Sequence, residues 1–65
     1  MNILLNGKEQ VVQKTTISEI IEELKIKTDF MAVTKNGEIV NRQRWQNVIL
    51  NEKDKLDLFS IAGGG

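Results

Sequence analysis

The stretch "ILLNGKEQVV", residues 3–12, decides how this chain begins to fold. Two apolar runs, Ile3–Leu5 and Val11–Val12, flank the dipeptide Asn6-Gly7. Asn-Gly readily adopts the two positive φ angles of a type I′ turn, whose twist matches that of paired strands. The stretch therefore predicts a β-hairpin.

The same signal occurs again further along the chain. Met31–Thr34 and Glu38–Val40 flank Asn36-Gly37, which predicts a second hairpin. The stretch "KLDLFSI", residues 55–61, alternates apolar and other residues and predicts a final strand.

Between the two hairpins, "TTISEIIEELKIK", residues 15–27, has the period of a helix. Its apolar residues recur at i, i+3, i+4 and i+7: Ile17, Ile20, Ile21 and Leu24. Thr16 followed by Glu19 is a capping box, so we expect the helix to start at Thr16. Lys25 and Lys27 are expected at its end, where cations suit the helix dipole.

The stretch "RQRWQNVILNEKD", residues 42–54, shows no clear period and is expected to hold a short turn of helix before Asn51–Asp54. The element order is then strand, strand, helix, strand, strand, strand. The single apolar helix face must be buried against one face of the sheet. The sequence therefore predicts one layered α+β domain over residues 1–65.

The composition narrows the classes of function. The 65 residues include no Cys, His or Pro, and nine basic residues balance nine acidic ones. The zero formal charge argues against general attraction to nucleic acid or to an anionic membrane. No stretch approaches the roughly 20 apolar residues of a membrane span, and the start lacks a signal-peptide pattern. We expect a cytoplasmic protein.

Conventional catalysis has few candidate groups. Without His or Cys, the chain lacks the usual base or nucleophile for chemistry near neutral pH, so we expect no enzyme activity. The carboxylates of Glu19, Glu22 and Glu23 could hold a metal ion. The favoured interpretation is a solvated helix face that serves the helix dipole, with no bound metal or cofactor.

The stretch "RQRW" combines basic residues with an aromatic residue. Arg42, Arg44 and Trp45 could stack on and grip a single strand of nucleic acid. The favoured interpretation is that Trp45 covers the edge of a small core and the arginines are solvated.

The last strand carries apolar residues on both faces. Leu56 and Leu58 lie on one face, and Phe59 and Ile61 lie on the other. In a two-layer domain the second face has no helix to cover it, so Phe59, Ile61 and the following Ala62 would form a partner-docking surface. Alternatively the sheet curls and buries both faces, or the pattern slips at Phe59.

The chain ends in a tail, Ala62–Gly65, that we expect to be flexible and able to reach about 13–14 Å. Glycine has no Cβ, so such a tail can enter a channel that admits only backbone. A free carboxylate is a poor electrophile, and activation by a nucleotide would make it a good one. The alternative is a frayed terminus without function.

Together these motifs resemble the ubiquitin-like β-grasp proteins. "MNILLNGKEQ", "AVTKNGEIV" with "RW" following, and "LNEKDKLDLFSIAGGG" look like the ThiS family of sulfur carriers of thiamine biosynthesis. The resemblance covers the whole chain, and the short length favours this family over the longer molybdopterin carriers. It implies a mixed sheet of about five strands packed on one helix.

The resemblance also implies a role for the tail. Gly65 matches the glycine that a ThiF-like enzyme adenylates with ATP and magnesium. Sulfur, usually from a cysteine desulfurase, then displaces AMP to leave a thiocarboxylate, and the thiazole synthase ThiG takes that sulfur. Gly64 matches the second glycine of the pair that enters the partner's active site, and Gly63 is an additional spacer. The protein would be a co-substrate throughout.

The residues agree with this implication at one point. A carrier could hold sulfur on a cysteine, and this chain has none, which leaves the carboxylate of Gly65. Three alternatives remain open: a sulfur carrier for another pathway of the molybdopterin type, a ubiquitin-like modifier that forms an amide with a lysine, and a small nucleic-acid or protein interaction domain that uses "RQRW".

Overall fold

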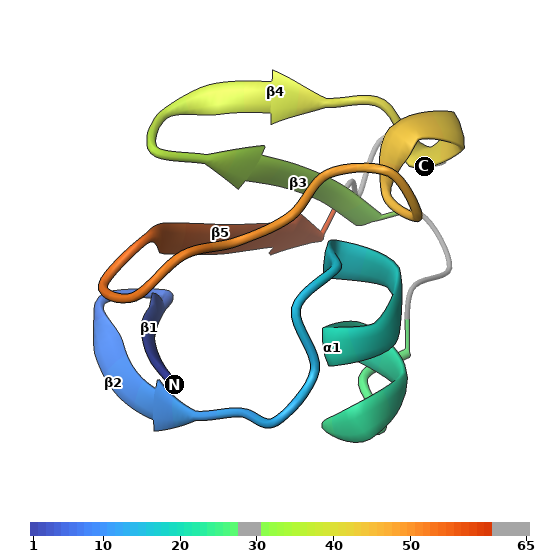
Figure 1. Ribbon diagram of the computed structural model, residues 1–65. Helices are drawn as coiled ribbons and strands as arrows, with labels where there is room; N and C mark the ends of the chain where they lie inside the picture. The colour runs from blue at the N-terminus through green and yellow to red at the C-terminus, as the bar shows by residue number, and fades with distance from the viewer. Residues whose placement is uncertain (28–30, 61–65) are drawn as a thin grey trace.

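The computed structural model describes residues 1–27 and 31–60, which form a curved sheet with one α-helix packed on it (Figure 1). This arrangement confirms the predicted α+β class. The elements in chain order are β1 (Asn2–Leu5), β2 (Lys8–Val11), α1 (Ile17–Glu23), β3 (Met31–Lys35), β4 (Glu38–Val40), the 3₁₀ helix η1 (Arg42–Arg44) and β5 (Lys55–Ser60).

The described strands form one five-stranded mixed sheet in the order β2-β1-β5-β3-β4. β1 and β5 run parallel, whereas the other neighbouring pairs are antiparallel. The last strand in the sequence is therefore the central strand of the sheet, between β1 and β3 (Figure 1). Ser60, the last described residue, consequently lies in the middle of the sheet and not at its edge.

Both Asn-Gly turns form as predicted. Asn6 and Gly7 have φ angles of 51° and 83°, and Asn36 and Gly37 have φ angles of 51° and 89°. Two consecutive positive φ angles are the signature of the type I′ turn. The register across each turn pairs the flanking residues directly, Leu5 with Lys8 in the first hairpin.

The helix begins where the capping box predicted. Thr16 is the N-cap, and its Oγ1 accepts a hydrogen bond from the Glu19 backbone N–H at 3.2 Å. Thr16 Oγ1 also donates to Glu19 Oε1 at 3.0 Å. These bonds satisfy one of the free donors in the first turn and fix the direction in which the chain enters the helix.

The prediction that Lys25 and Lys27 lie at the end of the helix was wrong, because α1 ends at Glu23. Lys25 has a φ of 55°, and its N–H bonds to the Glu22 carbonyl, while the Ile26 N–H bonds to the Ile21 carbonyl, both at 3.1 Å. This is the Schellman pattern of a helix end, with lysine in the position that glycine usually takes.

The helix and the sheet share one core. Within the described chain its buried side chains are Ile3, Val12, Ile17, Ile20, Ile21, Val33, Trp45, Leu50 and Leu56. The predicted apolar helix face is confirmed, with Leu24 only partly buried against the core. No helix among the described residues is long and apolar enough to cross a membrane.

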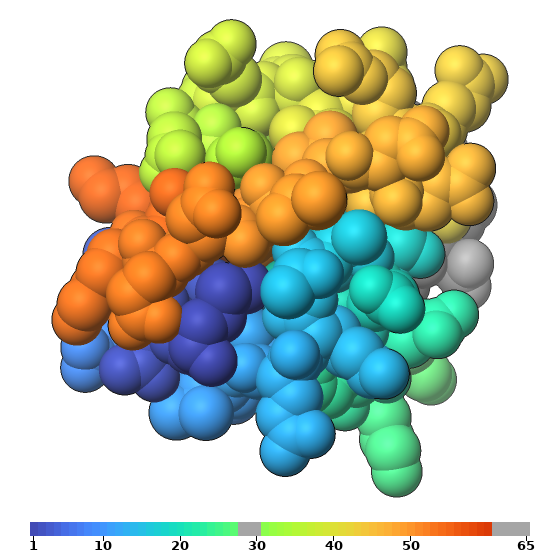
Figure 2. All heavy atoms as spheres, in the orientation of Figure 1, coloured from blue at the N-terminus to red at the C-terminus, as the bar shows by residue number. Residues whose placement is uncertain are grey.

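The connection between β4 and β5 closes one side of this core. The predicted short helical turn is η1, and the chain after it pairs with the start of the helix through Ile17 N–H to Val48 O and Leu50 N–H to Thr15 O. Figure 2 shows this connection as an orange band that crosses the molecule between the β3–β4 hairpin and the segments coloured blue and cyan. It buries Leu50 and Trp45, although it contains little regular structure.

Candidate functional site

The predicted site residues fall into two groups. Phe59 belongs to β5 and is described, whereas Ile61, Ala62 and Gly63–Gly65 lie outside the described residues. The structure therefore describes the base from which the tail extends. That base is the end of the central strand, at Ser60.

The two faces of β5 differ as the alternation predicted. Leu56 is fully buried and Leu58 packs against the core, while Phe59 on the opposite face is 52% exposed. The sheet does not curl over this outer face, and the alternation does not slip at Phe59. Of the two interpretations, the structure supports an uncovered apolar side chain beside the tail. Its role in docking stays a prediction.

Other apolar side chains share this outer face of the sheet. Ala32 lies directly opposite Phe59, and Ile39, opposite Thr34, is 76% exposed. Val11, at the far edge on β2, is 67% exposed. The outer face thus presents apolar groups scattered across several strands, which by themselves do not mark a docking surface.

The asparagines of both turns hold the central strand, a role that the sequence analysis missed. Asn6 N–H donates to the Leu56 carbonyl at 3.0 Å, and Asn6 Oδ1 accepts from the Leu58 N–H at 2.8 Å. Asn36 makes the corresponding pair of bonds to Lys55, at 2.8 and 2.9 Å. Nothing in the sequence indicated these bonds, because the turn geometry alone already explains why asparagine occurs at both positions.

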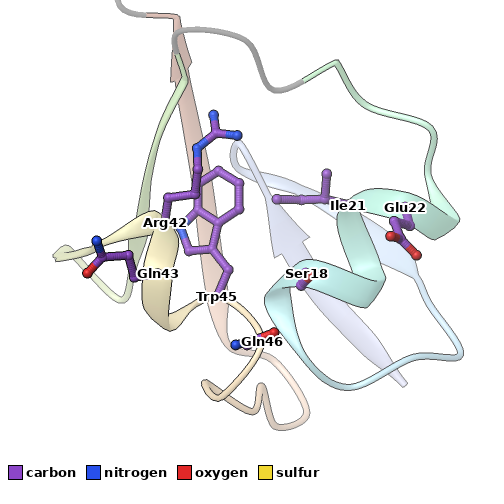
Figure 3. A pocket seen from close by; sticks show the side chains of 7 residues that line it. All are labelled: Ser18, Ile21, Glu22, Arg42, Gln43, Trp45 and Gln46. Atoms are coloured by element: carbon purple, nitrogen blue, oxygen red, sulfur yellow. The ribbon is translucent and has the colours of Figure 1, made fainter.

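The "RQRW" stretch does not form a platform for nucleic-acid bases. Trp45 is only 6% exposed, and its Nε1–H donates to the Val40 carbonyl at 3.0 Å. The Arg42 guanidinium carbon lies 4.7 Å from the centroid of the indole ring (Figure 3). Because the ring is buried and already stacked, no base can lie on it, so the favoured interpretation of Trp45 as a core residue is confirmed.

The acidic residues of the helix have structural contacts. Glu23 accepts hydrogen bonds from the backbone N–H groups of Lys14 and Gln13 at 3.0–3.1 Å, and these bonds lower the pKa of its carboxyl group. Glu19 is bound to the helix cap. Glu22 and Ser18 line one side of a shallow groove, and Arg42 lines the facing side (Figure 3). Within residues 1–27 and 31–60 no three acidic side chains gather in a possible metal site.

The comparisons with known proteins agree with this geometry. The family model described as the ThiS family matches residues 3–65. The sulfur carrier protein ThiS of Escherichia coli is 32% identical over the full length of both chains. A thiazole synthase of Paramagnetospirillum magneticum is also 32% identical over the whole chain, but the chain spans only 20% of its length.

The solved structures give the same result for the fold. The crystal structure of the thiamine biosynthesis protein ThiS from Geobacter metallireducens superposes over all of both chains with a TM-score of 0.88 at 26% identity. The predicted β-grasp fold is therefore confirmed. A match over nearly the whole sequence and over the whole fold shows that this chain belongs to the ThiS family.

Proposed function

We propose that this protein carries sulfur as a thiocarboxylate on Gly65 and delivers it to thiazole formation. Membership of the ThiS family makes the chain a sulfur carrier of thiamine biosynthesis and not an enzyme, as the sequence analysis predicted. The proposal adds the atom that carries the sulfur and the partners that load and unload it.

One observation carries the proposal: the five residues 61–65, three of them glycine, follow directly on the central strand of the sheet. Five extended residues reach about 17 Å, enough to enter a partner's active site while the folded domain stays outside. The three terminal glycines would need only the width of a backbone. Because the chain has no cysteine, the group that would bear the sulfur is the Gly65 carboxylate.

The chemistry requires two substitutions, the first at the α-phosphorus of ATP and the second at the carbonyl carbon of Gly65. A carboxylate oxygen of Gly65 attacks the α-phosphorus of ATP, pyrophosphate leaves, and an acyl-adenylate forms. Hydrosulfide then attacks the acyl carbon and AMP leaves with the original carboxylate oxygen, so that a thiocarboxylate remains. A ThiF-like enzyme would bind ATP and magnesium and catalyse the adenylation. In the cell a cysteine desulfurase would supply the sulfur as a persulfide, and a thiol reductant would release it as hydrosulfide.

The recipient would be a thiazole synthase of the ThiG type. The similarity between this chain and part of the P. magneticum thiazole synthase supports that pairing. Phe59, with Ile61 and Ala62, would contact each partner in turn, because this face lies beside the base of the tail. All these steps are expected in the cytoplasm, where ATP and the partner enzymes are available.

Intact mass spectrometry tests the proposal directly. The protein is incubated with a ThiF-like enzyme, ATP, magnesium and sulfide, and we expect a mass gain equal to sulfur replacing oxygen. Deleting Gly65, or adding one residue after it, should abolish the gain without changing the circular dichroism spectrum, because only the reacting carboxylate moves. A persistent gain in the extended variant would refute Gly65 as the carrying residue.

A second variant tests the narrow channel. Gly64→Leu adds a branched side chain next to the reacting carboxylate and should slow adenylation strongly while the fold stays intact. Pyrophosphate release at the wild-type rate would show that the tail does not pass through a channel limited to backbone.

A further inference from the structure

The backbone of β5 has two edges with different partners. The carbonyls of Asp54 and Leu56 accept hydrogen bonds from β1 and its turn, and the Leu58 N–H donates to Asn6 on the same side. Lys55 instead bonds to Asn36, on the side of β3. Main-chain groups alternate along a strand, so the even-numbered residues of β5 face β1 and the odd-numbered ones face β3.

The β1 side of this strand is covered over only part of its length. The β1–β5 ladder ends where Leu5 lies opposite Leu56, and Asn6 extends it to the Leu58 N–H. The Leu58 C=O and the N–H and C=O of Ser60 project from the same side. They have no hydrogen-bond partner within residues 1–27 and 31–60. We call these three groups the open edge of β5.

We propose that an extended segment of the adenylating enzyme pairs with the open edge of β5 when the tail is activated. This inference rests on the proposed function, since it names how the loading partner holds the carrier. An unpaired strand edge is a template for another strand, and main-chain bonds of this kind recur in peptide recognition. The open edge continues directly into the tail, so a strand bound there would also guide the tail.

Two neighbouring features fix where such a segment lies. The Leu58 N–H already donates to the Asn6 side chain, so the added strand cannot pair with β5 on the N-terminal side of Leu58. Phe59, 52% exposed on the outer face, would pack against side chains of the added segment. The partner therefore fits as a short extended segment with an apolar residue facing Phe59.

Amide hydrogen exchange tests the pairing in the intact protein. The Ser60 N–H should exchange at least about tenfold more slowly in the complex with a ThiF-like enzyme than in the free protein, as expected for a new hydrogen bond. The Ile39 N–H is the matched control, because it faces outward from β4, the edge strand on the far side of β3. Its exchange should stay unchanged. An unchanged Ser60 rate in a formed complex would overturn the proposal.

A proline variant removes the Ser60 N–H and so tests whether this group bonds to the partner. The Ser60 N–H makes no bond to β3, so Ser60→Pro removes a donor only from the open edge, a position where strands tolerate proline. We expect the KM for the carrier in adenylation to rise roughly two- to tenfold, with Ser60→Ala as the unchanged control. If Ser60→Pro fails to fold, the exchange experiment decides.

The outcomes separate this inference from the proposed function. A wild-type protein that gains sulfur, while Ser60→Pro keeps the wild-type KM and the Ser60 amide stays unprotected, would refute the strand pairing alone. A wild-type protein that gains no sulfur with an enzyme active on another carrier would refute the proposed function and the pairing built on it.

Discussion

Replacing Asn6 with glycine isolates one hydrogen bond at the base of the tail. Glycine retains the positive φ of 51° that the turn requires and removes only the side chain whose Oδ1 accepts the Leu58 N–H at 2.8 Å. Asn36→Gly is the matched control. It makes the same change at the same φ, and it removes an acceptor bound to the Lys55 N–H at 2.9 Å, at the opposite end of β5. It also removes the 3.3 Å hydrogen bond that Asn36 Nδ2 donates to Asp54 Oδ1.

The magnitude follows from the bond that is lost. A hydrogen bond from one backbone N–H to a side-chain acceptor contributes about 0.5–1.5 kcal/mol to the free energy of unfolding. The added freedom of glycine in the unfolded chain costs about 0.4–1 kcal/mol and is partly offset by relief of the positive φ. The free energy of unfolding of both variants should therefore fall by about 1–2 kcal/mol, which lowers the Tm by roughly 4–16 °C for a domain of this size.

The two variants should differ in function. Without Asn6 the last residues of β5 lose their anchor to the first hairpin, so the KM for the carrier in adenylation should rise roughly two- to tenfold. Asn36→Gly should keep the wild-type KM, because its bond lies at the start of the strand. The assays are thermal unfolding by circular dichroism and pyrophosphate release by the adenylating enzyme.

Two results would contradict this reasoning. An equal rise in KM for both variants would show that loss of stability, and not the position of the bond, impairs activation. An unchanged Tm for Asn6→Gly would show that water replaces the side chain at Leu58 without cost.

Three further substitutions test the fold. Glu23→Gln should flatten the fall of the Tm at acid pH. Hydrogen bonds from the backbone of Lys14 and Gln13 lower the pKa of Glu23, so the stability that its carboxylate contributes is present above the ordinary pKa of 4.5 and is lost as the pH falls through the lowered pKa. An unchanged fall of the Tm at acid pH would contradict this. Lys25→Gly should stabilise the protein by about 0.4–1 kcal/mol, measured by urea denaturation, because Lys25 has a φ of 55°; a loss of stability would show that the lysine side chain matters more. Trp45→Ala should lower the free energy of unfolding by about 3–5 kcal/mol, since Trp45 is only 6% exposed. A small change in the urea midpoint would show that the indole ring is not part of the core.

Much of the fold was predictable because its signals are local. The φ angles of Asn6 and Asn36 depend on residue type, and the start of the helix depends on Thr16 and Glu19, three residues apart. The end of the helix was predicted less well. Charge favoured a helix that ends at Lys25 and Lys27. The helix ends instead at Glu23, because the positive φ of Lys25 does not continue it. That geometry accompanies the packing of Ile26 against the core.

Only part of the candidate site could be foreseen. The alternation along β5 placed Phe59 opposite the buried face, but its exposure depends on the absence of a covering layer, which local sequence does not specify. The role proposed for the glycine tail came from a family resemblance, because glycine has no side chain to reveal chemistry. The anchoring by Asn6 was not foreseen, since its partner Leu58 lies 52 residues away.

The sequence alone established the turns, the helix start, the strand alternation and the lack of a cysteine that could hold sulfur. The tertiary structure decided that the last strand lies at the centre, parallel to the first, with its end open beside Asn6. The physical reason is range. Periodicity and turn geometry act over a few residues, whereas the order of strands depends on which distant apolar faces pack together around one core.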